Sequence, residues 1–223
     1  MNDNLYYFLY IVLSGVYLSI IFLVSLLLEH ITKTPKDLGR KIIHILFANW
    51  YFIPFLMVSA REQTLIAIIP PLIFTALNFL SYRYKIVKMI ERDNRFDLGT
   101  ISYPLAFTLI IILANYFFKM PYIGLLAALI LGYGDGLASI VGRYFSGDKN
   151  HKSIYGSITM LTVSFILALV FVVLYQGFAY FYFAIVIALL SAVLEYFGPH
   201  GIDNITVPLG VSLGYFLLVF LII

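Results

Sequence analysis

Residues 132–159 read GYGDGLASIVGRYFSGDKNHKSIYGSIT, and this stretch determines how the rest of the chain must be arranged. It begins inside one apolar segment and ends inside the next, yet it contains Asp135, three cations and repeated glycines. An ionised Asp costs roughly 2.5–3.5 kcal/mol to insert into hydrocarbon, so it needs a partner or a function. An acid at this position predicts a functional site, although a structural ion pair with an arginine of a neighbouring helix is the alternative.

Small residues within the stretch predict a close contact between helices. On a helix, Gly134, Ala138 and Gly142 share one face at i, i+4 and i+8, which lets another backbone approach. A second stripe beside this face carries an acid, a hydroxyl and a base: Asp135, Ser139 and Arg143. The glycine-rich, basic run that follows is of the kind whose backbone N–H groups fold over phosphates.

The composition predicts a polytopic membrane protein. Hydrophobic residues make up 62% of the 223 residues and charged residues 11%, which is far from the balance of a soluble domain. The length suits one domain over residues 1–223. A net charge of +3, scattered along the chain, gives no indication of nucleic-acid binding. Because there is no cysteine, disulfides and thiolate chemistry are excluded.

Eight apolar segments are each near the ~20 residues that a helix needs to cross a bilayer. They span about 5–28, 42–60, 64–81, 101–118, 121–145, 157–175, 178–198 and 205–222. We expect Pro70–Pro71 to kink the third segment. The fold class is therefore all-α, with about eight transmembrane helices.

Charge alternates between successive loops. The odd-numbered loops carry 12 of the 14 Lys and Arg residues, and only Arg61 and Lys119 fall in the even-numbered ones. By the positive-inside rule the odd loops are cytoplasmic and both termini lie outside. Residues 82–95 fit a cytoplasmic interfacial helix, with binding of anionic lipid or nucleotide as the alternative.

Further polar groups fall at helix ends on the same predicted side. Arg40 and His44 lie four apart, one turn into the second segment, where an ordinary cationic flank is the alternative to a functional role. Lys152 precedes two hydroxyls, Ser153 and Ser157, in an order that is not that of a P-loop. Either serine would equally serve as a helix N-cap.

Two acids lie close together near the C-terminus. Glu195 ends the seventh segment, and Asp203 and Asn204 follow the turn that starts at Gly198. Brought to the face that holds Asp135, these carboxylates would provide hard oxygen ligands suited to Mg²⁺. Alternatively, Asp203 and Asn204 merely cap the last helix.

At these residues the sequence resembles the CTP-dependent polyprenol kinases, a family that includes dolichol kinase, phytol kinase and the CTP-using diacylglycerol kinase. The matching motifs are Arg40-Lys41-x-x-His44, Gly134-Asp135-x-x-Ala138-x-x-x-Gly142-Arg143, Lys152-Ser153-x-x-Gly156-Ser157, and Glu195 followed by Asp203-Asn204 and Pro208. Where the family has a GRR-like pair, this chain has Arg143-Tyr144, so a second cation must come from elsewhere, such as Lys149.

The resemblance implies transfer of the γ-phosphate of CTP to the hydroxyl of a membrane lipid alcohol, with Mg²⁺ or another divalent cation. The acceptor would be a polyprenol, dolichol, phytol, geranylgeraniol or diacylglycerol. The active site would face the cytoplasm, from a cell membrane or a membrane of the endoplasmic reticulum type. The catalytic residues are expected to be Asp135, Lys152, Glu195 and Asp203, and the three acids are also the expected metal ligands. The residues expected to bind nucleotide or phosphate are Arg40, His44, Gly134, Gly136, Ser139, Gly142, Arg143, Lys149, Ser153, Gly156, Ser157 and Asn204.

Two other functions fit part of the pattern. The run from Gly198 to Asn204 resembles the PGHGGxxDRxD signature of CDP-lipid synthases, but Asn204 stands at the Arg and Thr206 at the second Asp. A small transporter would use Asp135 and Glu195 as an ion or proton site. It would place polar groups on both sides of the membrane, which the one-sided charge of the loops disfavours.

Overall fold

The computed structural model describes residues 3–30, 35–84, 99–146, 152–199 and 201–223. Among these residues the secondary structure is entirely helical, as the composition predicted. The helices are α1 (Asp3–His30), α2 (Lys36–Trp50), α3 (Phe52–Met57), η1 (Arg61–Gln63), α4 (Thr64–Ala67), α5 (Ile69–Tyr84), α6 (Gly99–Ile111), η2 (Ile112–Phe117), α7 (Pro121–Leu129), η3 (Ile130–Asp135), α8 (Gly136–Ser146), α9 (Ile154–Tyr175), η4 (Phe178–Tyr180), α10 (Tyr182–Phe197) and α11 (Asp203–Ile222).

Six stretches of the described chain are long and apolar enough to cross a membrane. They are Asp3–Leu28, Arg61–Tyr84, Gly99–Phe117, Pro121–Ser146, Ile154–Tyr175 and Asp203–Ile222. The two other predicted segments correspond to shorter elements, the α2–α3 pair and α10. Each predicted segment thus has a helical counterpart, while the number of crossings and the placement of the termini outside stay predictions.

Prolines account for two of the helix breaks. The predicted kink at Pro70–Pro71 appears as a break at Ile68, between α4 and α5. A proline ring displaces the carbonyl four residues before it and removes one hydrogen-bond donor, so the helix yields just upstream. Pro54 follows a similar break at Tyr51, between α2 and α3.

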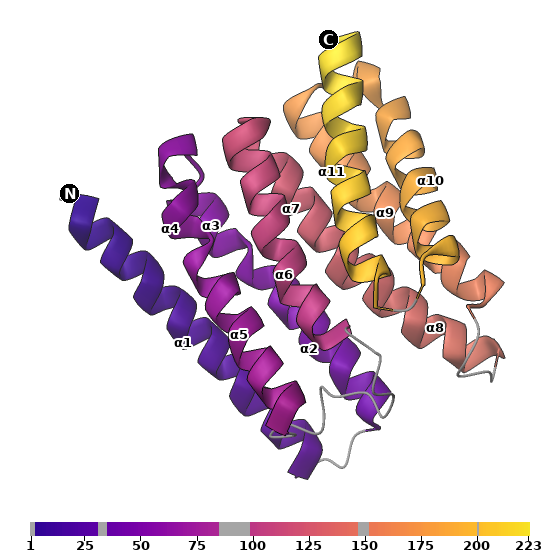
Figure 1. Cartoon of the computed structure of the whole chain (residues 1–223). Coiled ribbons are helices and arrows are strands. Elements are labelled where there is room, and N and C mark those ends of the chain that lie inside the picture. The colour runs from indigo at the N-terminus through magenta and orange to yellow at the C-terminus, as the bar shows by residue number, and fades with distance from the viewer. Residues whose placement is uncertain (1–2, 31–34, 85–98, 147–151, 200) are drawn as a thin grey trace.

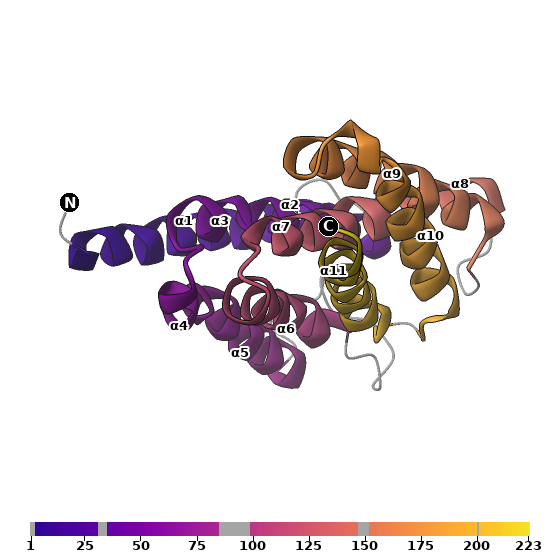
Figure 2. The same cartoon turned by 90° about the horizontal axis from the view of Figure 1, so that it is seen from above.

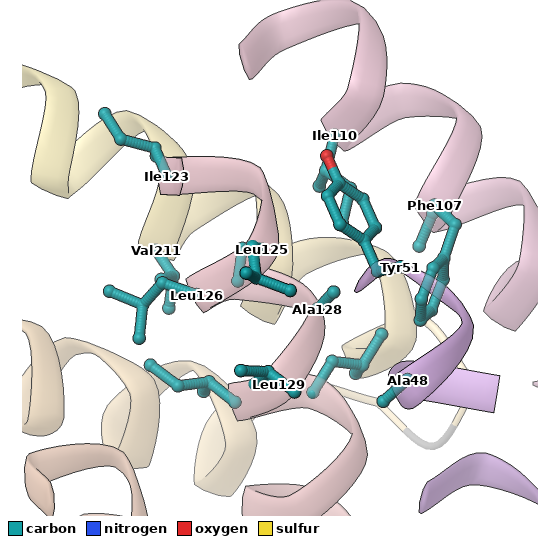
Figure 3. Packing of buried hydrophobic residues seen from close by; sticks show 14 of the residues in the cluster. Ala48, Tyr51, Phe107, Ile110, Ile123, Leu125, Leu126, Ala128, Leu129 and Val211 are labelled. Carbon is teal, nitrogen blue, oxygen red and sulfur yellow. The ribbon is translucent and has the colours of Figure 1, made fainter. Parts of the chain in front are cut away.

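The helices form a bundle with α7 at its centre. Figure 2 shows α8, α9 and α10 to one side of α7, and α4, α5 and α6 to the other. Of the most apolar part of Pro121–Ser146, 78% is buried, against 22% for the corresponding part of α1, which is therefore exposed over most of its surface. Figure 3 shows Leu125 and Leu126 of α7 packed between Tyr51 of the α2–α3 corner and Val211 of α11.

The two ends of the bundle differ in charge. In Figure 1 both termini lie at the upper end, and the starts of α2, α6 and α11 lie at the lower end. The lower end also receives the ends of α5, α8 and α10. Among the described cations, Arg61 and Lys119 belong to the upper end, as the loop charges predicted, and the lower end holds Arg40, Lys41, Arg83, Arg143 and Lys152.

Candidate active site

Three acidic side chains from distant parts of the sequence meet at the lower end of the bundle. One carboxylate oxygen from each of Asp135, Glu195 and Asp203 lies within 4.8 Å of the other two, and all three residues are buried. Asp135 ends η3, Glu195 lies in the last turn of α10, and Asp203 is the first residue of α11. The convergence expected from the sequence is therefore present in the structure.

Two lysines neutralise part of this cluster. Lys152 Nζ lies 3.1 Å from Glu195 Oε1 and 3.1 Å from Asp203 Oδ2, and it also donates to the Glu195 carbonyl. Lys41 Nζ donates to Asp135 Oδ2 at 2.6 Å, from a position that is only 6% exposed. We call these five residues the acid–lysine cluster: Asp135, Glu195, Asp203, Lys41 and Lys152.

The charges of the acid–lysine cluster fit a divalent cation. Three carboxylates and two ammonium groups sum to −1, so with Mg²⁺ these five residues would sum to +1, which suits an anionic phosphate. Carboxylate oxygens are the ligands that Mg²⁺ prefers, and Mg²⁺ usually keeps several waters beside one or two protein carboxylates. Asp135, Glu195 and Asp203 are thus a suitable donor set, in number, chemistry and proximity.

A π-helical turn positions Asp135. The residues Ile130–Asp135 form η3 between α7 and α8, within one otherwise continuous apolar helix. Such turns insert an extra residue into the helical ladder and often occur at functional sites. Gly132 lets η3 pack closely on α2, because a Cβ there would lie 2.2 Å from the Ala48 Cβ. The turn brings Asp135 against Lys41 of α2.

The turn before α11 positions Asp203. Gly201 has φ +88°, a value that L side chains rarely adopt, and its N–H donates to Asp203 Oδ1 at 2.8 Å. The N–H of Asn204 donates to the same oxygen at 3.0 Å, while Oδ2 faces Lys152. The two predicted roles of Asp203, helix cap and metal ligand, are therefore compatible. One carboxylate oxygen orders the start of α11, and the other belongs to the acid–lysine cluster.

Asn204 anchors the start of α11 to the start of α6. Its Nδ2 donates to the Gly99 carbonyl at 3.0 Å and to Ser102 Oγ at 3.2 Å. Ser102 in turn donates to the Gly201 carbonyl at 2.6 Å. In this geometry the Asn204 amide orders the backbone beside Asp203.

The four glycines expected to bind phosphate make close contacts between helices, while their role toward phosphate stays a prediction. The predicted small-residue face contacts α9: a Cβ on Gly134 would meet Met160 Sδ at 2.8 Å, and one on Gly142 would meet Ser153 Oγ at 2.7 Å. A Cβ on Gly156, from the α9 side, would lie 3.0 Å from the Ala138 carbonyl. The close helix contact predicted from Gly134, Ala138 and Gly142 is confirmed. Gly136 packs in the same way against Ile45 of α2.

Other described candidates follow Asp135 or Lys152 in the sequence. Ser153 is the N-cap of α9, where its Oγ accepts from the Gly156 N–H at 3.1 Å, and Ser157 donates to the Ser153 carbonyl at 3.4 Å. Ser139 and Arg143 follow Asp135 along α8, and both are half-buried. Lys149 lies outside the described residues, as does most of the 82–95 segment.

Arg40 and His44 line a pocket between α2, α5 and α6. Both side chains line this pocket together with aromatic residues of the three helices. Lys41, the neighbour of Arg40, points to Asp135 instead. Lys41 belongs to the motif Arg40-Lys41-x-x-His44, but no role was predicted for it. Its position next to Arg40 could have indicated a role. Consecutive helical residues point about 100° apart, so Arg40 and Lys41 can belong to two different sites.

Comparison with known proteins gives relatives of one kind. The chain is 32% identical over 216 residues to "Phytol kinase" of Synechocystis, covering 90% of this chain and 88% of that protein. It is 25% identical over 228 residues to "Phytol kinase 1, chloroplastic" of Arabidopsis thaliana, covering 92% of this chain and 74% of that protein. It is 26% identical over 209 residues to "Probable phytol kinase 1, chloroplastic" of Oryza sativa, covering 82% and 65%. No family model matches the chain, and no solved structure gives a significant match.

The helical membrane fold, the acid–lysine cluster and these relatives together define the chain as a lipid-alcohol kinase. Within that class, the chain belongs to the phytol kinase family. The resemblance deduced from the motifs is thereby confirmed at the level of the family.

Proposed function

We propose that this protein transfers the γ-phosphate of CTP to the hydroxyl of phytol or a closely related isoprenoid alcohol. The observation that carries the proposal is the acid–lysine cluster, in which three carboxylates and two lysines from distant parts of the chain converge. The names of the relatives support an isoprenoid acceptor. The resemblance of the motifs to CTP-dependent kinases supports CTP as the donor.

Phosphoryl transfer requires mainly positioning and neutralisation of charge. Asp135 and Asp203 would hold Mg²⁺, which when bound would neutralise the phosphate oxygens and orient them. Lys152 directly precedes Ser153, the N-cap of α9, so the residue lies beside the N-terminus of α9 while its ammonium pairs with Glu195 and Asp203. That helix end carries partial positive charge and favours phosphate.

Glu195 is the carboxylate best placed to take the proton of the acceptor. It reaches the cluster from α10, and its carboxylate accepts from Lys152. A lipid hydroxyl is a poor nucleophile, and a carboxylate within hydrogen-bond reach assists it by removing the proton during attack. The hydroxyl of an isoprenoid alcohol lies at headgroup depth, where helix ends expose such groups.

The orientation in the membrane follows from the charges at the two ends of the bundle. We propose that the lower end in Figure 1, with the acid–lysine cluster, faces the cytoplasm. The chain has no native cysteine, so single cysteines report cleanly. Ser146→Cys should react with a membrane-impermeant maleimide from the cytoplasmic side, and Glu62→Cys from the other side. The opposite labelling pattern would reverse the proposed orientation.

The products of the nucleotide test the reaction itself. Purified protein in nanodiscs is given radiolabelled CTP, Mg²⁺ and phytol or geranylgeraniol. We expect CDP and a lipid monophosphate, formed in equal amounts. Pyrophosphate release with a lipid phosphate acceptor would instead establish a CDP-lipid synthase and overturn the proposal. ATP, GTP and UTP in place of CTP test the donor, and equal rates with all four would remove CTP from the proposal.

A further inference from the structure

A pocket between α2, α5 and α6 lies outside the acid–lysine cluster and has no role in the phosphoryl transfer described above. Its lining includes Arg40, His44, Phe47, Phe74, Asn78 and Tyr103. Five of these residues, Arg40, His44, Phe47, Asn78 and Tyr103, are themselves buried at 7% exposure or less, so the pocket is built into the bundle.

Polarity changes along the pocket. Arg40 lies near the start of α2 and Asn78 near the end of α5, so both belong to the lower end of the bundle, where the charged groups gather. Asn78 Nδ2 donates to the Thr100 carbonyl at 3.0 Å and joins α5 to α6 there. Farther into the bundle the walls are aromatic, with the rings of Phe47 and Phe74 stacked at 4.9 Å between centroids. The pocket therefore has a polar mouth and an apolar interior.

The mouth of this pocket is next to the acid–lysine cluster. Arg40 lines the pocket, and Lys41, the next residue, pairs with Asp135 at 2.6 Å. The wall between the two sites includes the stacked rings of His44 and Tyr103, 3.8 Å apart, and Tyr103 donates to the His44 carbonyl at 2.7 Å. A Cβ on Gly132 of η3 would lie 3.4 Å from the Tyr103 hydroxyl. A single layer of side chains thus separates the pocket from the π-helical segment that ends at Asp135.

We propose that this pocket binds the hydroxyl-bearing end of one isoprenoid chain and thereby selects the acceptor; this inference rests on the proposed function. A single methyl-branched chain makes dispersion contacts with ring faces such as those of Phe47 and Phe74. A polar mouth suits its hydroxyl, and the Arg40 guanidinium suits the lipid phosphate that the reaction forms. Diacylglycerol carries two chains on one glycerol, and we expect a pocket between three packed helices to exclude it. Phe47, Phe74 and Tyr103 are accordingly specificity-determining residues.

Photocrosslinking tests this assignment without requiring turnover. The probe is a geranylgeraniol analogue with a diazirine near its alcohol end, added to the full chain in nanodiscs. We expect crosslinks on peptides of α2, α5 and α6, and competition by phytol but not by diacylglycerol. Crosslinks confined to other helices, or equal competition by diacylglycerol, would overturn the proposal.

A pair of substitutions on one helix tests specificity. Phe74→Trp fills the pocket and should raise the KM for the alcohol about tenfold, with the KM for CTP unchanged. Phe79→Trp adds the same bulk on a lipid-facing position of α5, which is 53% exposed, and should change neither KM. If Phe74→Trp unfolds the protein, Phe74→Leu replaces it, and we then expect a shift in preference among alcohols of different branching.

The outcomes separate this inference from the proposed function. Crosslinks in the pocket without any transfer from CTP would leave the pocket in place and reject the kinase reaction. Transfer from CTP with an inert pocket would reject the pocket alone. A KM effect on CTP with none on the alcohol would assign the pocket to the nucleotide base and overturn the inference.

Discussion

Two polar clusters lie at opposite ends of the bundle, and they are built differently. The acid–lysine cluster at the lower end joins ionisable groups of η3, α10, α11 and α2 with Lys152, just before α9. The upper end holds a neutral cluster in which Gln176 Nε2 donates to the Tyr122 hydroxyl at 2.9 Å and Tyr215 donates to Gln176 Oε1. Tyr175 stacks on Tyr122 at 3.9 Å. We call the second group the tyrosine–glutamine cluster: Tyr122, Tyr175, Gln176 and Tyr215.

The difference between the two clusters distinguishes a functional site from a set of contacts that holds helices together. In the tyrosine–glutamine cluster, donors and acceptors match one another across α7, the C-terminal end of α9, and α11, and no charge is left over. The acid–lysine cluster has one more carboxylate than it has ammonium groups. Carboxylates held this close together in a buried site favour a bound cation. We therefore assign the chemistry to the lower end and a structural role to the upper end.

The largest effect is expected from Asp135→Asn. This change keeps the shape of the side chain and removes the charge that would hold the metal. We expect a loss of several hundredfold in turnover, the size found when one essential electrostatic group is deleted. Steady-state rates with CTP and phytol measure it. Glu62→Gln, an exposed acid in η1 at the upper end, is the matched control and should keep full activity. Activity of Asp135→Asn within threefold of the original would assign Asp135 to structure.

Lys152→Ala and Glu195→Gln should separate nucleotide binding from proton removal. Lys152 lies beside the N-terminus of α9, and its loss should weaken CTP binding and lower turnover together. Glu195→Gln should lower turnover about a hundredfold with CTP binding kept, the size typical of a missing general base. Equilibrium binding of CTP to both variants, beside their rates, makes the comparison. If Glu195→Gln fails to bind CTP at saturating Mg²⁺, Glu195 is a ligand of the nucleotide-bound metal and not the base.

Lys41 tests whether the ion pair with Asp135 is structural. Breaking a buried pair by removing one partner leaves an uncompensated charge and costs roughly 3–5 kcal/mol. Lys41→Met should therefore destabilise the protein strongly, measured as resistance to thermal unfolding in detergent. The double variant Lys41→Met/Asp135→Asn has no buried charge left over at this pair and should regain most of the stability. It should remain inactive, because the proposed metal ligand is still missing. Recovery of activity in the double variant would contradict a role for Asp135 in catalysis.

The fold was predictable because membrane insertion constrains it so strongly. An apolar stretch of about 20 residues has few alternatives to a helix in hydrocarbon, and Pro70–Pro71 predicted where one of them breaks. The faces of helices were predictable as well, since Gly134, Ala138 and Gly142 do pack against α9. The π-helical turn at Ile130–Asp135 was not predicted, because hydrophobic periodicity does not reveal one extra residue in a continuous apolar run.

The convergence of the site was predictable in part. Asp135, Glu195 and Asp203 were expected to meet because loop charge placed all three at one side of the membrane. Lys41 was not given a role, because the direction of a side chain near a helix start depends on how that helix is rotated against its neighbours. Arg40 and His44 were expected to bind nucleotide or phosphate, which stays a prediction; in the structure they line a pocket between α2, α5 and α6. Sequence spacing fixes which residues share a helix face, and packing decides what that face meets.

The smallest effect is expected at the tyrosine–glutamine cluster. Tyr215→Phe removes the hydroxyl that donates to Gln176 and leaves the ring in place among α7, α9 and α11. One hydrogen bond contributes about 1 kcal/mol, and bonds within membranes are on average weaker still. We expect a slightly lower unfolding temperature and turnover within twofold of the original, measured in the same nanodiscs as the Asp135 variant. Gln176 has partners on two sides, so Gln176→Leu should lower stability further, again with turnover kept. If Tyr215→Phe lowers turnover as much as Asp135→Asn does, the tyrosine–glutamine cluster takes part in the reaction. The assignment of a purely structural role to the upper end would then be wrong.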